Sequence, residues 1–323
     1  MNIASDTPSK KVLNKKVIGN LLVLTTTIIY SFNTNFMKSI IPEWISPFGL
    51  VLARTTASTI GFFIIAFFMQ VKKENRPQGK AIGTIMLGGL LGIGANLLFY
   101  IKGISLTLPI DAFVVRTAQP IIVILLAVIF LGERFTKNKF IGIILGMAGT
   151  IYIVLAPNVG IHSSDPMVGD IFIFIASVCS ALFLILIKPY TVKYNLFWTM
   201  AWMSLAAFIL TLPFGFKELT EAPLFHQAVP AMVWFKLSYI LFISTMAGYA
   251  LSVKALNYIS PFIESLYIYL LPITGAIVAI LMGLQKFSWH DPIALVLIIL
   301  GFIIVNMDSS SQKVHPKIPQ QTH

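Results

Sequence analysis

The sequence predicts an all-α polytopic membrane protein in which ten transmembrane helices form two inverted five-helix repeats. Three observations support this fold class: an apolar composition, ten apolar runs of spanning length, and an internal repeat that covers five runs. Of the 323 residues, 57% are hydrophobic and 11% are charged, and the mean hydropathy is +0.87. Soluble domains carry a charged share of about 25%, so this chain is expected to lie in a lipid bilayer.

The apolar runs are expected to be helices. A helix needs about 20 residues to cross the hydrocarbon core, and lipid offers the backbone no hydrogen-bond partner outside the segment itself. A spanning barrel shows short alternating segments, whereas these runs are apolar on all sides. The ten expected spans, numbered in chain order, are 17–37, 46–71, 80–101, 109–131, 137–156, 168–187, 196–216, 230–252, 261–284 and 289–307.

The distribution of lysine and arginine predicts the orientation. With the N-terminus inside, the cytoplasmic segments carry 16 of these residues and the outer segments carry five, while Arg54 and Arg116 lie within spans. Because basic residues are enriched in cytoplasmic loops, both termini of this multi-pass plasma (inner) membrane protein are expected in the cytoplasm. Basic loops beside anionic lipid headgroups account for the net charge of +11 without a nucleic-acid partner.

The two halves of the chain resemble each other at a shift of 152 residues. The stretch "KGISLTLPIDAFVVRTAQPI" from Lys102 aligns without a gap on "KALNYISPFIESLYIYLLPI" from Lys254, so that Pro120 matches Pro272. A weaker match at a shift of 150 places Gly19 on Gly169 and Lys38 on Lys188. Because five is an odd number of crossings, the second copy enters the membrane from the opposite face, an arrangement that many alternating-access carriers share.

The repeat and the charge pattern together predict the domain organisation. It comprises a cytoplasmic N-terminal segment (1–16), a first repeat (17–157), a second repeat (168–307) and a cytoplasmic tail (308–323). The tail is polar and contains proline, so it is expected to be disordered.

Several short motifs resemble those of the EamA family of the drug/metabolite transporter superfamily. They are "LVLAR" (50–54) in span 2, "LGERF" (131–135) at the end of span 4, and the matching Pro120 and Pro272. The resemblance covers residues 17 to 307. It implies a secondary carrier, often an exporter of amino acids or other metabolites, with a central cavity lined mainly by spans 1, 3, 4, 6, 8 and 9. Where family members commonly have Trp-Gly in span 1, this chain has Tyr30-Ser31.

Two arginines lie within the expected spans at similar depth. At 1.5 Å per residue, Arg116 lies roughly 10 Å and Arg54 about 12 Å from the outer end of its span. Since an arginine at the centre of the bilayer costs about 2.5–3.5 kcal/mol or more, both are expected to face protein or a watery cavity. We hypothesise that Arg116 receives an anionic group of the substrate. Arg54 resembles an arginine common in the family and is expected to tie span 2 to its neighbours.

Other polar residues of the expected cavity extend this site. Asn33, Asn96 and Gln119 reach the layer of Arg116, and tyrosines of the second repeat supply a less polar lining. The predicted substrate-binding residues are Asn33, Asn96, Tyr100, Arg116, Gln119, Tyr249, Glu264 and Tyr267.

Two further sets have expected structural or conformational roles. Pro120 and Pro272 each remove a backbone donor and free a carbonyl one turn earlier, so they are expected to be gating points. Gly142, Gly146 and Gly149 form a small-residue face on span 5 that favours close packing. This face is expected to pack within the chain or in a homodimer through spans 5 and 10.

The leading interpretation is a secondary-active transporter that exports small metabolites such as amino acids or related organic anions. The alternative is an intramembrane enzyme acting on a lipid-linked substrate, which needs clustered acids or a nucleophile beside a base. The 12 acidic residues are scattered mostly singly, so no enzyme is expected. The five histidines are dispersed and no phosphate-binding loop motif occurs, so no metal or other cofactor is expected. The expected partners are a small-molecule substrate and the lipid bilayer.

Overall fold

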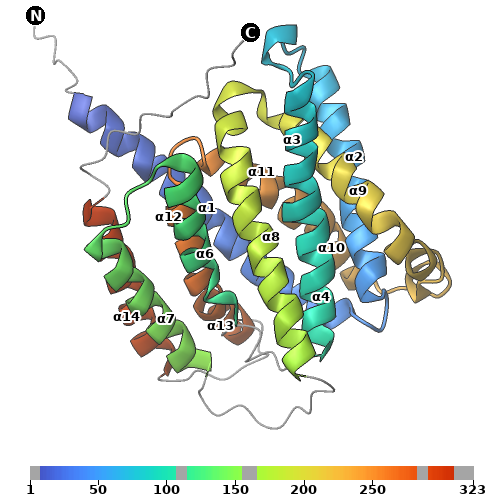
Figure 1. Ribbon diagram of the computed structural model, residues 1–323. Helices are drawn as coiled ribbons and strands as arrows, with labels where there is room; N and C mark the ends of the chain where they lie inside the picture. The colour runs from blue at the N-terminus through green and yellow to red at the C-terminus, as the bar shows by residue number, and fades with distance from the viewer. Residues whose placement is uncertain (1–7, 107–114, 155–165, 282–289, 309–323) are drawn as a thin grey trace, which may run out of the picture.

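The computed structural model describes residues 8–106, 115–154, 166–281 and 290–308. Within these ranges the secondary structure is helical, with short turns and loops and no strand (Figure 1). The predicted beginnings of spans 4 and 10, the predicted end of span 9 and the tail from residue 309 lie outside the described residues. The fold class is therefore all-helical, as the composition predicts.

The helices of the first repeat include two π-helical segments, η2 and η3, and one short 3₁₀ turn, η1. In chain order the elements are α1 (Pro8–Ile40), α2 (Pro47–Phe68), η1 (Lys73–Asn75), α3 (Lys80–Gly89), η2 (Leu90–Ala95), α4 (Asn96–Leu106), α6 (Gln119–Leu126), η3 (Ala127–Leu131) and α7 (Lys137–Val154).

The second repeat contains one π-helical segment, η5, and two 3₁₀ turns, η4 and η6. Its elements are α8 (Pro166–Lys193), α9 (Leu196–Thr220), η4 (Pro223–Phe225), α10 (Ala231–Ser238), η5 (Tyr239–Gly248), α11 (Tyr249–Ala255), α12 (Pro261–Leu266), η6 (Tyr267–Leu270), α13 (Leu271–Leu281) and α14 (His290–Asp308).

Seven helical stretches in the described ranges are long and apolar enough to cross a membrane, and they correspond to expected spans 1–3 and 6–9. The shorter apolar helices Gln119–Leu131 and Leu295–Val305 lie where spans 4 and 10 are expected, and α7 lies at span 5. Span 4 is short because its expected first residues are outside the described ranges. The total of ten spans therefore stays a prediction.

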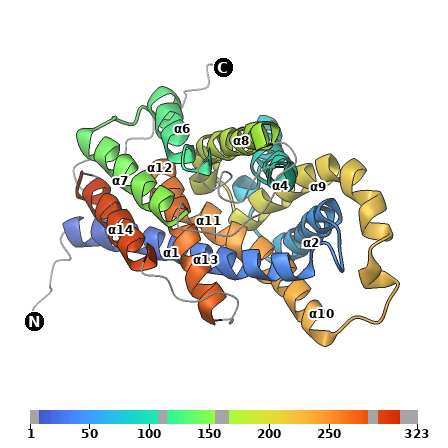
Figure 2. The ribbon, with the colours of Figure 1, turned by 90° about the horizontal axis from the view of Figure 1, so that it is seen from below.

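Elements of one repeat pack mainly against elements of the other. Helix α2 lies along α9, α7 lies along α14, α1 packs against α11 and α13, and α8 packs against α3, η2 and α4. Figure 2 shows the α7–α14 pair at one end of the molecule and the α2–α9 pair at the other. The middle of the molecule is thus built from spans 1, 3, 4, 6, 8 and 9.

Both repeats interrupt their α-helices at equivalent places. The π-helical η2 in span 3, shifted by 152, falls within the π-helical η5 of span 8. Pro120 is the second residue of α6 and Pro272 the second residue of α13. Each follows a non-α segment, a turn at Thr117 and Ala118 in one case and η6 in the other. Proline is accommodated there because the first turn of a helix needs no N–H donor.

One hydrogen bond locates the axis that relates the repeats. The hydroxyl of Tyr269 donates to the carbonyl oxygen of Thr117 at 3.1 Å, and these residues are 152 positions apart. A residue that contacts its own counterpart must lie close to the pseudo-twofold axis. The axis therefore passes between α6 and α13. It runs next to Thr117, which follows Arg116 in the sequence.

The small-residue face of span 5 lies against other parts of the same chain. A Cβ atom on Gly142 would meet Val305 and the carbonyl oxygen of Gly301 in α14, and one on Gly146 would meet the ring of Tyr269. Gly149 is buried on the same helix. The glycines thus allow α7 to approach α14 and η6 closely, while a homodimer through spans 5 and 10 stays a prediction.

Candidate functional site

Arg116 lies next to the axis with its charge facing an aromatic ring. Its guanidinium carbon is 4.4 Å from the centroid of the Tyr100 ring, a cation–π arrangement between span 4 and span 3. The Nε atom is buried and has no hydrogen-bond partner in the described ranges. Neither of the two ion pairs formed within those ranges includes Arg116. The guanidinium thus keeps donor capacity that no carboxylate of the described chain uses.

Gln119 lies one turn after Arg116, and only one of its two amide groups has a hydrogen-bond partner in the described chain. Its Nε2 donates to the Ser180 hydroxyl of α8 at 3.2 Å, while its Oε1 is buried without a partner in the same part of the chain. Arg116 and Gln119 together present an unused donor and an unused acceptor. Such a pair can bind a group that contains both an anionic oxygen and an N–H or O–H donor.

The two predicted asparagines have different environments. Asn96 donates from Nδ2 to the carbonyl oxygen of Ala176 at 2.7 Å, so its amide links α4 to the backbone of α8. Asn33 donates to the sulfur of Met37 at 3.2 Å, and its Oδ1 is buried without a partner among the described residues. Asn33 therefore keeps a free acceptor, whereas the Asn96 amide nitrogen is already used.

Tyr30 and Tyr249 form an aromatic pair between α1 and α11. Their ring centroids are 6.2 Å apart with an edge-to-face interplanar angle of 68°. Tyr249 lies within electrostatic range of both Arg54 and Arg116, and Tyr30 within range of Arg54 and Glu264. Sequence analysis did not assign Tyr30 to the site. The sequence did contain a signal for this residue, because Tyr30 stands where family members commonly have the tryptophan of Trp-Gly.

The other two predicted residues of the second repeat face different neighbours. Glu264 accepts a hydrogen bond from the Ser252 hydroxyl at 2.7 Å, which links α12 to α11. Tyr267 is buried against Phe302 of α14, with ring centroids 4.8 Å apart. Glu264 is thus within electrostatic range of Tyr30, whereas Tyr267 belongs to an apolar cluster with Val23.

Arg54 is 4% exposed and bonded to two neighbouring spans. Its Nε donates to the Thr245 hydroxyl at 2.8 Å, and its Nη1 lies 3.6 Å from the sulfur of Met37. Thr245 belongs to the π-helical η5, so Arg54 links α2 to the irregular part of span 8. The sequence predicted that Arg54 ties span 2 to its neighbours, and these contacts link it to spans 1 and 8.

The glutamate of "LGERF" forms a buried ion pair at one end of span 4. Lys139 Nζ lies 2.9 Å from Glu133 Oε2, with side chains 6% and 15% exposed, and its ammonium lies 5.3 Å from the centroid of Phe262 in α12. Nearby, Lys188 of α8 donates to the carbonyl oxygens of Leu256 and Ile259. Spans 4, 5, 6 and 9 are thus connected on this side, and sequence analysis did not identify these contacts.

No residues suited to a metal ion come together in the described ranges. Groups of three or more histidine, cysteine, aspartate or glutamate side chains at binding distance do not occur there. The candidate site is therefore a polar layer around Arg116, Gln119, Tyr100, Tyr30 and Tyr249, located between the two repeats.

Comparisons with known proteins agree with the two-repeat architecture. A solved crystal structure of a protein matches with a TM-score of 0.74 over 90% of this chain and 96% of that one, at 17% identity. This likeness concerns the fold alone. The chain is 25% identical to the uncharacterized transporter YyaM of Bacillus subtilis (strain 168), over 80% of this chain and 84% of that protein.

A second relative covers almost the whole length. The chain is 22% identical to the uncharacterized transporter YetK of Bacillus subtilis (strain 168), over 96% of this chain and 94% of that protein. The family model described as the EamA-like transporter family matches residues 17–155 and again residues 167–307. Two matches that together span both halves show that this multi-pass membrane protein belongs to the EamA-like transporter family.

Proposed function

We propose that the chain is a secondary-active transporter that exports amino acids or related organic anions by alternating access around a central cavity between the repeats. The transporter family and the names of the relatives support a carrier rather than an enzyme acting on a lipid-linked substrate. The repeat itself supports alternating access, because two inverted halves can exchange conformations and so open opposite faces in turn.

The Nε of Arg116 is the observation that supports the substrate class. This atom is buried without a hydrogen-bond partner in the described chain, and the guanidinium lies over the ring of Tyr100. A guanidinium offers a planar fork of donors that matches a carboxylate, and it stays charged at physiological pH. A substrate carboxylate bound here completes the hydrogen bonds of Arg116, while Gln119 Oε1 accepts from a neighbouring donor of the substrate.

The opposite side of the layer suits the rest of an amino acid. The faces of Tyr30 and Tyr249 attract a cationic or apolar group, and Glu264 lies within electrostatic range of Tyr30. An amino-acid ammonium bound on this side and a carboxylate bound at Arg116 place the zwitterion across the axis.

Transport by purified protein in proteoliposomes tests the proposal. A panel of labelled amino acids, organic anions, organic cations and neutral sugars is offered, with protein-free liposomes as the control. We expect uptake of compounds that carry a carboxylate and competition among them. Transport confined to cations or sugars contradicts the carboxylate assignment, and absence of carrier-dependent uptake for the whole panel contradicts the substrate class.

The proposed orientation has both termini in the cytoplasm at the plasma (inner) membrane. The lysine and arginine asymmetry between the two sides supports it. Reporter fusions after Lys16 and after Gln312 are both expected to report the cytoplasm. If the two fusions report opposite compartments, the number of crossings is odd and the five-plus-five arrangement is wrong.

A further inference from the structure

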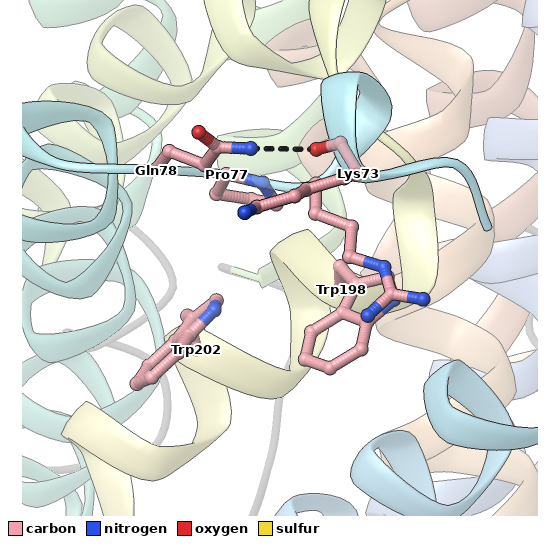
Figure 3. A pocket seen from close by; sticks show the side chains of 6 residues that line it. Lys73, Pro77, Gln78, Trp198 and Trp202 are labelled. Carbon is pink, nitrogen blue, oxygen red and sulfur yellow. Dashed lines mark hydrogen bonds between the residues drawn. The ribbon is translucent and has the colours of Figure 1, made fainter. Parts of the chain in front are cut away.

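A second candidate site lies away from the axis, between the loop that follows α2 and the first two turns of α9. The structure contains an open pocket there with a volume of about 320 Å³. Figure 3 shows the Lys73 side chain above the space between the indole rings of Trp198 and Trp202. One wall of the pocket is cationic and another is aromatic. The lining residues are Lys73, Arg76, Pro77, Gln78, Trp198 and Trp202.

The pocket wall is held in place by contacts within the protein. Arg76 Nε donates to the carbonyl oxygen of Val71 at 2.8 Å, and the guanidinium carbon lies 5.0 Å from the Trp198 ring centroid. The backbone N–H of Asn195 donates to Asn75 at 2.9 Å, which connects the loop to the beginning of α9. The Arg76 guanidinium and the loop backbone are therefore already positioned, which reduces the ordering needed when a ligand binds.

The equivalent loop of the second repeat is filled by a leucine side chain. The turn η1 shifted by 150 coincides with η4, and each turn is tied by a backbone hydrogen bond to the segment that precedes the adjacent long helix. In η4 the side chain of Leu224 is 3% exposed and fills an apolar cluster with Ile45 and Leu50. Its counterpart in η1 is Glu74, which is exposed. The same backbone framework thus closes one loop with leucine and leaves the other open beside two cations.

The aromatic wall continues toward the lipid-facing surface. Phe63 of α2 contacts both indoles, with ring centroids 6.2 Å from Trp198 and 5.6 Å from Trp202. One turn later Phe67 is 74% exposed, as expected for a side chain that faces acyl chains. Tryptophan is enriched where the headgroups meet the hydrocarbon core. The pocket therefore lies beside an apolar surface that begins at the end of a predicted span.

We propose that this pocket binds the phosphate group of an anionic phospholipid on the side of the membrane where the lysine-rich loops lie. Arg76 and Lys73 supply charge-assisted donors to the phosphate oxygens, and the acyl chains extend past Phe63 and Phe67. Inorganic phosphate has the same anionic chemistry but gains nothing from the aromatic wall. The apolar contacts are the reason to assign the lipid.

Lipid binding to the purified full-length chain tests this assignment. Native mass spectrometry measures binding of phosphatidylglycerol and of phosphatidylcholine to the wild type, Lys73→Gln, Arg76→Gln and Lys72→Gln. Lys72 is the matched control, because it is adjacent in sequence and 82% exposed at its side chain but does not line the pocket. We expect a loss of about tenfold in phosphatidylglycerol affinity for Lys73→Gln and Arg76→Gln. Lys72→Gln is expected to stay within about twofold.

Three results overturn the assignment. Equal losses in all three variants mean that general surface charge attracts the lipid. Displacement of phosphatidylglycerol by inorganic phosphate at matched concentration means that the pocket is a soluble-anion site. Because Arg76 also holds the loop, Lys73→Gln decides the question if Arg76→Gln reduces the yield of folded protein. An undiminished preference for phosphatidylglycerol over phosphatidylcholine in Lys73→Gln also contradicts the proposal.

Discussion

Spans 4 and 9 occupy equivalent positions in the two repeats, yet their chemistry differs at the centre of the molecule. The shift of 152 places Pro120 on Pro272, and both prolines begin a new α-helix after an interruption. The same shift places Arg116 on Ile268, an apolar residue. The repeat thus preserves the backbone framework, whereas only one copy carries a charge at this position. Function in an inverted repeat can therefore be localised by comparing each residue with its counterpart.

The largest effect is expected on substrate affinity when Arg116, the charged member of the Arg116–Ile268 pair, is replaced. Arg116→Gln is expected to weaken apparent substrate affinity about 10- to 150-fold, because a charge-assisted pair contributes about 1.5–3 kcal/mol. Arg116→Lys keeps the charge but lacks the planar fork, so a smaller loss is expected. Both are measured as the concentration dependence of uptake in proteoliposomes, alongside the yield of detergent-extracted protein.

The matched control for Arg116 is its counterpart in the other repeat. Ile268→Leu conserves volume and is expected to leave affinity unchanged. Unchanged affinity together with reduced yield in Arg116→Gln contradicts the role of Arg116 as a substrate ligand. Equal affinity losses in Ile268→Leu and Arg116→Gln contradict a specific role for the charge at position 116.

The second prediction concerns the close packing of α7 of the first repeat against α14 of the second. Gly142→Ala adds a Cβ against Val305 and within 2.8 Å of the Gly301 carbonyl oxygen, so α7 and α14 must separate. Overpacking of this kind costs about 1–3 kcal/mol, and we expect a lower melting temperature in detergent. Gly83→Ala is the control, because a Cβ there has no neighbour within 4 Å in the structure. Equal melting temperatures for the two variants count against close α7–α14 packing.

The third prediction compares the two prolines directly. Pro120→Ala and Pro272→Ala restore a backbone donor that can extend each helix across the interruption before it. Both are therefore expected to stiffen the span and to slow transport by similar factors. A change of about 1 kcal/mol in the balance between open states alters a rate about fivefold. Transport rate and labelling of cysteines introduced near each face by a water-soluble thiol reagent provide the measurement. Normal rates with unchanged labelling in both variants show that the prolines are not gating points.

The smallest expected effect is at the contact between counterparts. Tyr269→Phe removes the hydroxyl that donates to the Thr117 carbonyl across the axis. We expect a stability loss of about 0.5–1.5 kcal/mol, measured by thermal unfolding in detergent. Tyr267→Phe is the control, because that ring packs on Phe302 and its hydroxyl has no hydrogen bond to the described residues. A larger loss for Tyr267→Phe contradicts a stabilising role for the axis contact.

Sequence patterns predicted the helical segments because these depend on local chemistry. A run such as Pro47–Phe68 is apolar along its whole length, and lipid requires such a run to satisfy its own backbone. Pro120 and Pro272 mark helix beginnings because proline lacks an N–H wherever it occurs. Local chemistry did not predict that Asn96 uses its amide on the backbone at Ala176. That contact depends on how α4 is rotated against α8.

The sequence by itself determined the membrane environment, the two-repeat organisation and the presence of an arginine that lipid cannot accommodate. These follow from run length, an internal match and the cost of burying charge, which need no coordinates. Only the tertiary structure decided that Arg116 faces Tyr100 without a carboxylate partner in the described chain, and that Tyr267 packs on Phe302. The reason is physical: side chains far apart in sequence meet only when helix packing sets rotation and depth together. The same packing placed Thr117 beside Tyr269, and so put the repeat axis next to Arg116.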